Sequence, residues 1–339
     1  MRRLLQAALP GLPYPFAGTP APCALCGGTA ATVIARLDRR LKPLTTVACT
    51  GCGLIRTDPM PTEAELAAYY TVLYRLDYQL AGRGPSRAHL GRGRREAAGR
   101  LALLAPALPR GARVLDFGCG SGEFLAALAA AGHAPLGLEP GADYAAAARR
   151  RYGVPVLAAS LGEAEFPARS FDAITAHHVI EHLRDPVAAL ARLAGWLRAD
   201  GVLYVSVPDL SPSDQPPFAR LHFAHVHNFV PATLLAAARR AGLEPDPRFP
   251  PQGTTLVLRH AAAGPATAAE VADPARAATI IAGLPDVSPL RHALSLRWVG
   301  RTARKARRWI SNTAGGCRRP PRSAAAAPRK PASLAAEPQ

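Results

Sequence analysis

Two spacings of apolar residues alternate along the middle of the chain. Short apolar runs, typical of buried strands, alternate with longer segments in which apolar residues recur every three or four positions, as on one face of a helix. This alternation predicts a doubly wound, mostly parallel sheet with helices on both faces. The predicted strands are 112–117, 134–139, 154–157, 171–176, 201–207, 243–250 and 254–261, and the predicted helices are 94–107, 122–131, 142–152, 186–198 and 231–241.

The last two predicted strands, 243–250 and 254–261, are joined by too few residues for a crossover helix. Such a tight connection favours a hairpin, which places one antiparallel strand in an otherwise parallel sheet. We therefore expect an α/β fold with a doubly wound, mostly parallel seven-stranded sheet.

The flanking segments have other patterns. Thr62 and Glu65 have the spacing of a helix cap, and a Tyr-rich helical pattern follows them. The Ala-, Pro- and Arg-rich C-terminal end has the composition of a disordered segment. The predicted organisation is a leader at 1–20, a cysteine-bearing unit at 21–60, a Tyr-rich helical linker at 61–93, the α/β domain at 94–262, a C-terminal helical extension at 263–311 and a basic tail at 312–339.

The charge of the chain is formally +17 and comes almost entirely from arginine, since lysine occurs only at positions 42, 305 and 330. On an Ala- and Pro-rich background this indicates a general bias of the composition toward arginine, so the charge alone does not predict a nucleic-acid partner. Residues 297–330 contain many basic residues and no acidic one, which leaves a peripheral membrane contact of the tail as an alternative to a solvated tail.

A compartment can be inferred from the ends of the chain and its apolar runs. Pro10 and Pro13 interrupt the first apolar run before a signal-peptide core could form. The sequence also lacks a run of about eighteen apolar residues, the length that spans a bilayer. We expect a cytoplasmic protein.

The segment "VLDFGCGSGEFL" places Gly118, Gly120 and Gly122 between a predicted strand and a predicted helix. Bare backbone at such a turn lets a ligand approach the main chain at a helix N-terminus. The third glycine of a dinucleotide-binding loop would fall at 123, which is Glu123, and the Asp116 carboxylate would repel a pyrophosphate. Asp116 instead suits a cationic or zwitterionic ligand, and Glu139 follows the next strand, where an acid can accept both ribose hydroxyls.

Residues 94–261 resemble a class I S-adenosylmethionine-dependent methyltransferase. The resemblance rests on "VLDFGCGSGEFL", "GLEP", "FPARSFDAITAHHVIEHLRDP" and "LRADGVLYVSVPD", in that order. It implies that the glycine loop cradles the methionine end of the cofactor and that the segment after the third strand lies beside the adenine. It also implies that the acid after the second strand binds the ribose, and that the histidine ending the fourth strand faces the sulfonium. The predicted cofactor-binding residues are Asp116, Gly118, Gly120, Glu139, Ser160, Leu161 and His177.

Four of the six cysteines form two C-x-x-C pairs, each followed by a glycine. Pairs at this spacing can hold one Zn²⁺ tetrahedrally, and four thiolates leave no open position, so the metal would be structural. A redox pair would not need the second pair. We predict a zinc ribbon with the ligands Cys23, Cys26, Cys49 and Cys52.

A zinc ribbon ahead of such a domain is similar to the sugar C-methyltransferases that act on nucleotide-linked deoxysugars and to related glycan-cluster enzymes. The resemblance covers about residues 23–260 and implies that the ribbon helps to form the substrate face. The family's Y-x-E-H segment resembles "HFAH", in which His222 replaces the tyrosine, Ala224 the glutamate, and His225 matches the histidine. Because the carboxylate is lost, O-methylation is as consistent with the sequence as C-methylation.

Candidate bases for removing a proton from the acceptor are His178 and His182, after the fourth strand, and His222 and His225, in the insertion after the fifth strand. The alternative for His182 and its neighbour Glu181 is a loop motif without chemistry, and a metal site at His222, His225 and His227 is a minor alternative. For Tyr70, Tyr74 and Tyr78, core packing is favoured over substrate contact.

These patterns predict a methyltransferase that uses S-adenosylmethionine and a structural Zn²⁺ and that acts on a nucleotide sugar or a glycan-related small molecule. One alternative is an RNA methyltransferase that uses the ribbon and tail, although the ribbon lacks aromatic residues for stacking on bases. A second alternative is a non-catalytic zinc-ribbon binding protein, against which the acids at 116 and 139 argue.

Overall fold

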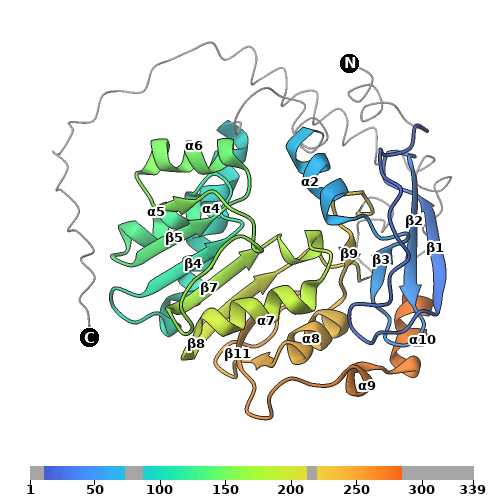
Figure 1. Ribbon diagram of the computed structural model, residues 1–339. Coiled ribbons are helices and arrows are strands. Elements are labelled where there is room, and N and C mark those ends of the chain that lie inside the picture. The colour runs from blue at the N-terminus through green and yellow to red at the C-terminus, as the bar shows by residue number, and fades with distance from the viewer. Residues whose placement is uncertain (1–10, 73–86, 212–219, 285–339) are drawn as a thin grey trace. The chain divides into compact units, whose positions relative to one another are not determined.

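The computed structural model describes residues 11–72, 87–211 and 220–284 (Figure 1). These residues lie within a first unit, residues 1–298, and the second unit, 299–339, falls outside the described residues. The predicted basic tail, Tyr74 and Tyr78 also fall outside them.

The larger sheet has seven strands in the order β10-β11-β8-β7-β4-β5-β6. The five strands from β8 to β6 are parallel, whereas β11 is antiparallel to both of its neighbours. The predicted mostly parallel sheet and its terminal hairpin are therefore confirmed. The strands are β4 (Arg113–Phe117), β5 (Ala134–Leu138), β6 (Val156–Leu157), β7 (Phe171–His177), β8 (Leu197–Ser206), β10 (Leu243–Pro245) and β11 (Thr255–His260).

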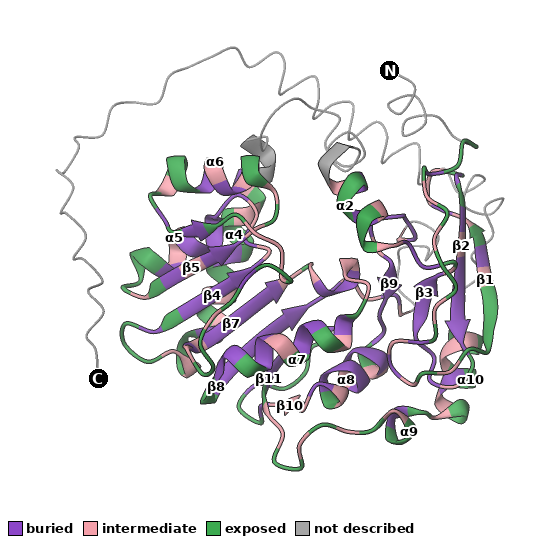
Figure 2. Ribbon diagram, viewed as in Figure 1, coloured by how far each residue is buried: buried purple, intermediate pink, exposed green. Residues whose placement is uncertain are grey.

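Helices cover both faces of this sheet because successive strand residues point to opposite sides. Val114 packs with α4 and α5 on one face, while Leu115 packs with α7 and α8 on the other. The strand interiors are almost entirely buried (Figure 2). The helices that accompany the sheet are α4 (Arg87–Leu104) with the short η1 (Ala105–Ala107), α5 (Glu123–Ala130), α6 (Ala142–Tyr152), η2 (Ile180–His182), α7 (Pro186–Trp196) and α8 (Pro231–Arg240).

Several element boundaries differ from the prediction. Strand β8 begins at Leu197 rather than at 201, because α7 ends at Trp196, before the predicted helix end at 198. Helix α4 begins at Arg87 rather than at 94, because Leu90 continues the buried stripe of Ala97 and Leu104 and outweighs the low helix propensity of the intervening glycines. Strand β10 ends at Pro245 rather than at 250, because several prolines follow and proline has no backbone N–H to donate to a neighbouring strand.

A second sheet, of order β1-β2-β3-β9, carries the cysteines at one end. Its strands are β1 (Ala31–Leu37), β2 (Pro43–Cys49), β3 (Ile55–Thr57) and β9 (His227–Asn228). The helix α2 (Glu63–Val72) follows it, with Thr62 and Glu65 forming the predicted cap, and α9 (Ala268–Val271) and α10 (Pro274–Gly283) come at the end of the described chain.

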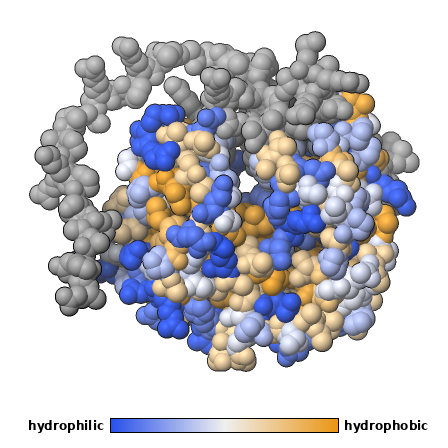
Figure 3. Space-filling view, in the orientation of Figure 1, coloured by the Kyte–Doolittle hydropathy of each residue, from blue (hydrophilic) through white to orange (hydrophobic). Residues whose placement is uncertain are grey.

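Strand β9 comes from the insertion after β8, so this small sheet is built from two distant parts of the chain (Figure 1). Leu25 and Leu54, from the cysteine unit, belong to the same core cluster as Leu190 and Leu234 of α7 and α8. The two sheets therefore share one core. On the face drawn in Figure 3, hydrophilic and apolar residues are interspersed, and within the described ranges the structure has no helix with the length and apolar character that a membrane span requires.

Candidate active site

The glycine loop leads from β4 into α5 at the carboxyl edge of the large sheet. Gly118 has φ +72°, and a Cβ there would overlap the side chain of Val179, so a glycine is required both by the backbone and by packing. Gly120 also has a positive φ, +52°, but a Cβ there would meet no atom within 4 Å. Open space thus faces the backbone at Gly120, as an approaching ligand needs.

Glu139, directly after β5, reaches this loop. Its carboxylate accepts hydrogen bonds from the backbone N–H of Gly120 at 3.0 Å and of Gly141 at 2.8 Å. A carboxylate has about four lone-pair sites. Glu139 is therefore held beside the loop, where a carboxylate can accept hydroxyl groups of a ligand.

Asp116 lies beneath the loop. Its side chain is buried, accepts a 2.6 Å hydrogen bond from the Thr175 hydroxyl and pairs with the Arg100 guanidinium at 3.5 Å. Burial raises the pKa of this carboxyl, and Arg100 and Thr175 oppose the rise. The sequence analysis did not identify Arg100, although a charged residue on the apolar stripe that contains Ala97 and Leu104 was a usable signal.

The other predicted cofactor residues lie at the ends of strands. His177 ends β7, and burial, assisted by the nearby Arg100 charge, lowers its pKa to about 2, which keeps the ring neutral. Ser160 follows β6 and donates its hydroxyl to Glu163 at 2.7 Å, while Leu161 packs against the main core. Strands β4 and β5 separate β7 from β6 in the sheet, and the contact of these side chains with a cofactor stays a prediction.

Glu181 is the centre of a histidine cluster beside the glycine loop. Its side chain is only 1% exposed, and its Oε1 lies 3.4 Å from Nδ1 of His178 and 3.9 Å from Nε2 of both His182 and His225. The sequence left open whether Glu181 takes part in chemistry or in a loop motif, and the histidines three positions before it and one after it were a usable signal for the first. The structure places its carboxylate next to His225, where the sequence shows only Ala224.

The insertion contributes His222 and His225, whose ring centroids lie 3.8 Å apart. Both are buried, and burial holds the pKa of each well below its ordinary value, with the Arg39 charge acting in the same direction. Each ring is therefore neutral. Tyr70 packs edge-on against His182 and donates its hydroxyl to the carbonyl of Ala224 at 3.3 Å, so this tyrosine borders the cluster.

The alternative metal site at His222, His225 and His227 is wrong. Nε2 of His227 lies 3.1 Å from the carbonyl oxygen of Arg184, away from the other two rings. Among the described residues, two groups bring at least three metal-ligating atoms within 4.8 Å of one another. They are Glu181 with His182 and His225, and the four cysteines.

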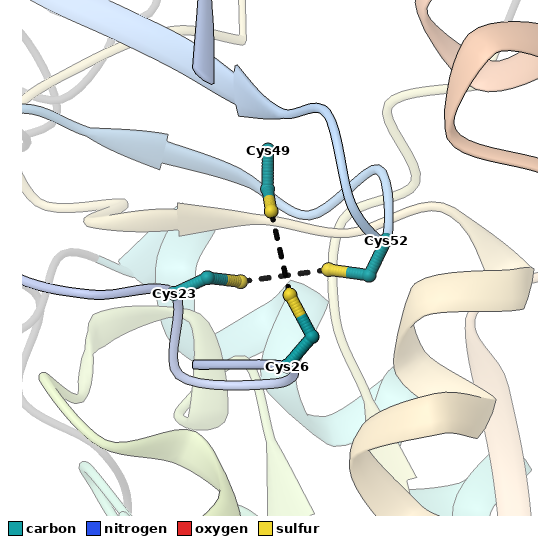
Figure 4. A group of neighbouring side chains, drawn as sticks. All are labelled: Cys23, Cys26, Cys49 and Cys52. Atoms are coloured by element: carbon teal, nitrogen blue, oxygen red, sulfur yellow. Dashed lines mark hydrogen bonds between the residues drawn. The ribbon is translucent and has the colours of Figure 1, made fainter. Parts of the chain in front are cut away.

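The four cysteine thiols converge on one point (Figure 4). The Sγ atoms of Cys23 and Cys52 are 3.5 Å apart, as are those of Cys26 and Cys49, which is close to the spacing of thiolates about 2.3 Å from a tetrahedral Zn²⁺. Hydrogen bonds from Cys23 and Cys52 lower the pKa of the Cys49 thiol. The donor set therefore fits a closed, structural zinc site.

Residues 89–247 match the family model of a methyltransferase domain. A ubiquinone biosynthesis O-methyltransferase of Xanthomonas axonopodis pv. citri is 31% identical over 159 residues, which are 40% of this chain and 64% of the relative. A Mycobacterium tuberculosis protein, named a probable S-adenosylmethionine-dependent methyltransferase, is 33% identical over 113 residues, which are 32% of this chain and 41% of the relative. The chain thus spans less than two thirds of the length of these curated relatives.

Among solved structures, the chain is similar to the crystal structure of a Burkholderia thailandensis 1,6-didemethyltoxoflavin-N1-methyltransferase with bound 1,6-didemethyltoxoflavin and S-adenosylhomocysteine. It is 21% identical, covers 62% of this chain and 96% of its own, and has a TM-score of 0.45. The family match assigns residues 89–247 to a methyltransferase domain, and the mostly parallel seven-stranded sheet described above gives it a Rossmann-like fold.

Proposed function

We propose that the protein is an S-adenosylmethionine-dependent methyltransferase whose acceptor binds between the glycine loop and the histidine cluster. One observation carries this proposal: Val179, between His178 and Glu181, packs directly on Gly118 of the loop. The residues suited to hold the cofactor and those suited to take a proton are therefore adjacent at the carboxyl edge of the sheet, where α/β folds bind ligands.

The residues around the loop fit S-adenosylmethionine, which supplies an electrophilic methyl group on its sulfonium. The open backbone at Gly120 accommodates the methionine end, and the Glu139 carboxylate, held beside the loop, accepts the ribose hydroxyls. Asp116 acts from below as a positioning residue, because its contacts with Thr175 of β7 and Arg100 of α4 fix the end of β4, from which the loop starts. His177, held neutral by burial, adds no positive charge beside the sulfonium.

Methyl transfer needs alignment of the acceptor, together with a base when the acceptor atom carries a proton of high pKa. His178 suits this role because its side chain is 48% exposed while its Nδ1 faces Glu181 at 3.4 Å. An Nδ1–H held toward the carboxylate leaves Nε2 with a lone pair for the acceptor proton. His225 and His222, neutral and buried behind it, line the acceptor side.

We favour an oxygen acceptor. Ala224 stands where the sugar C-methyltransferases resembled by the sequence carry a glutamate, and relatives of the domain are named O-methyltransferases. The nucleotide-sugar or glycan-related identity of the acceptor stays a prediction, which incubation with labelled cofactor and a panel of nucleotide sugars and phenols tests by the mass of the labelled product.

Calorimetry with S-adenosylmethionine and S-adenosylhomocysteine tests the cofactor assignment. We expect binding by the wild-type chain and at least tenfold weaker binding by Glu139→Gln, a loss of ~1.4 kcal/mol. Glu244→Gln is the matched control, since Glu244 lies on the edge strand β10, where it pairs with Arg259. A folded wild-type chain that binds neither compound would refute the proposed function.

A further inference from the structure

We propose that Glu181, His182 and His225 form a second metal site, which takes a divalent transition-metal ion through nitrogen and oxygen ligands. The Glu181 Oε1 atom lies 3.9 Å from Nε2 of His182 and 3.9 Å from Nε2 of His225. These distances are too long for hydrogen bonds. Ligand atoms that each lie about 2.0–2.2 Å from one ion are roughly 3–4 Å apart, so the spacing suits a shared cation.

The Glu181 carboxylate supplies a second, independent observation. Both of its oxygens are buried, and neither makes a hydrogen bond of good geometry among the residues that the structure describes; the nearest ring nitrogen, Nδ1 of His178, lies 3.4 Å from Oε1. Burying a carboxylate without a compensating partner is costly. A cation at the point where Oε1 faces the two imidazoles compensates the buried charge.

The tautomer of His182 also supports a cation beside Glu181. Its Nδ1 lies 2.7 Å from the carbonyl oxygen of Ala224, which can only accept, so Nδ1 carries the proton and Nε2 has a lone pair directed at Glu181. Without a cation, two acceptors would face each other there. A metal-binding histidine usually donates its other ring N–H to a carbonyl or carboxylate, as His182 does to Ala224.

The donor set selects the class of ion. Two imidazoles and one carboxylate suit Zn²⁺, Co²⁺, Mn²⁺ or Fe²⁺, whereas Mg²⁺ and Ca²⁺ prefer oxygen ligands alone. Three protein ligands leave coordination positions open. An acceptor oxygen in an open position would be a stronger acid, and His178 would lie beside it. The ion's part in catalysis rests on the proposed function, but its binding does not.

Cobalt titration of the full-length chain loaded with only one equivalent of Zn²⁺, which fills the cysteine site, and without S-adenosylmethionine, tests the site. We expect one Zn²⁺ held by the cysteines and one further Co²⁺ per chain, with visible d–d bands but without the intense sulfur-to-cobalt charge-transfer band of a thiolate site. Glu181→Gln and His225→Asn should each weaken Co²⁺ binding at least tenfold. His260→Asn, a change at the far end of β11, should leave it unchanged.

The zinc content of each variant reports its fold, because the cysteine site shares a core with the sheet. If one variant loses its zinc, His182→Gln replaces it. No Co²⁺ binding by the wild-type chain, or equal binding by folded Glu181→Gln and His225→Asn, would overturn the second site. Either result would leave cofactor calorimetry, and with it the proposed function, untouched.

Discussion

An alanine at Gly118 and an alanine at Gly120 should have opposite consequences. Both residues have a positive φ, so alanine costs each position about 1–2 kcal/mol of backbone strain. At Gly118 the new methyl group also overlaps the side chain of Val179, and such overpacking typically costs a further 1–3 kcal/mol. Gly118→Ala should therefore lower the free energy of unfolding by roughly 2–5 kcal/mol, and Gly120→Ala by only about 1–2 kcal/mol.

The effect on cofactor affinity should follow the opposite order, with binding weakened more by Gly120→Ala than by Gly118→Ala. The methyl group of Gly120→Ala enters the open space over the loop, where we place the methionine end of the cofactor, so this folded variant should bind S-adenosylhomocysteine at least tenfold more weakly. Denaturant unfolding measures the first comparison and calorimetry the second.

Replacing Val179 with alanine tests the steric overlap between its side chain and the new methyl group at position 118. In Gly118→Ala/Val179→Ala the overlapping side chain is absent, so the two changes should cost at least ~1 kcal/mol less together than the sum of their separate costs. If Gly118→Ala were as stable as Gly120→Ala, the packing argument would fail. If Gly120→Ala bound the cofactor with wild-type affinity, the assignment of the open space would fail.

Three further predictions concern the cysteine metal site, the buried Asp116–Arg100 ion pair and the pH dependence of stability. Cys49→Ser should reduce the bound zinc and lower stability by several kcal/mol, because the ribbon shares its core with the large sheet; unchanged zinc by mass spectrometry would contradict this. Asp116→Asn should cost about 3–5 kcal/mol by leaving the Arg100 charge buried without its partner, and a loss in denaturant unfolding no greater than that of Thr175→Val would exclude such a pair. The pKa of His177, lowered to about 2 in the folded chain, makes the unfolded chain bind more protons below pH 6.5, so stability should fall as the pH drops from 6.5 to 4.5. The slope should be smaller by up to ~1.4 kcal/mol per pH unit in His177→Asn, and identical slopes would refute it.

Local patterns were enough to predict the large sheet. Its strands are apolar runs bounded by turn residues, and the short predicted connection 251–253 indicated the terminal hairpin. The zinc ligands were equally accessible, since both cysteine pairs lie on local turns closed by Gly27 and Gly53, whose N–H groups bond back to Cys23 and Cys49.

Long-range contacts were not accessible in the same way. Nothing near Ala224 in the sequence shows that the carboxylate of Glu181, 43 positions earlier, lies beside His225. The role of Asp116 likewise depends on Arg100 and Thr175, which come from a helix and a neighbouring strand. The spacing of residues in the sequence shows which side chains project from the same face of one helix or strand. Which helices and strands contact each other depends on tertiary packing.

The pairing of β3 with β9 limits how this protein can be divided. Ile55 pairs with Asn228 and Arg56 with His227, only a few residues after His222 and His225. A fragment ending near residue 60 would leave the β3 edge bare and prone to self-association. Grafting the ribbon alone onto another enzyme would break the same ladder, so a chimera that exchanges acceptor preference must carry both segments across together.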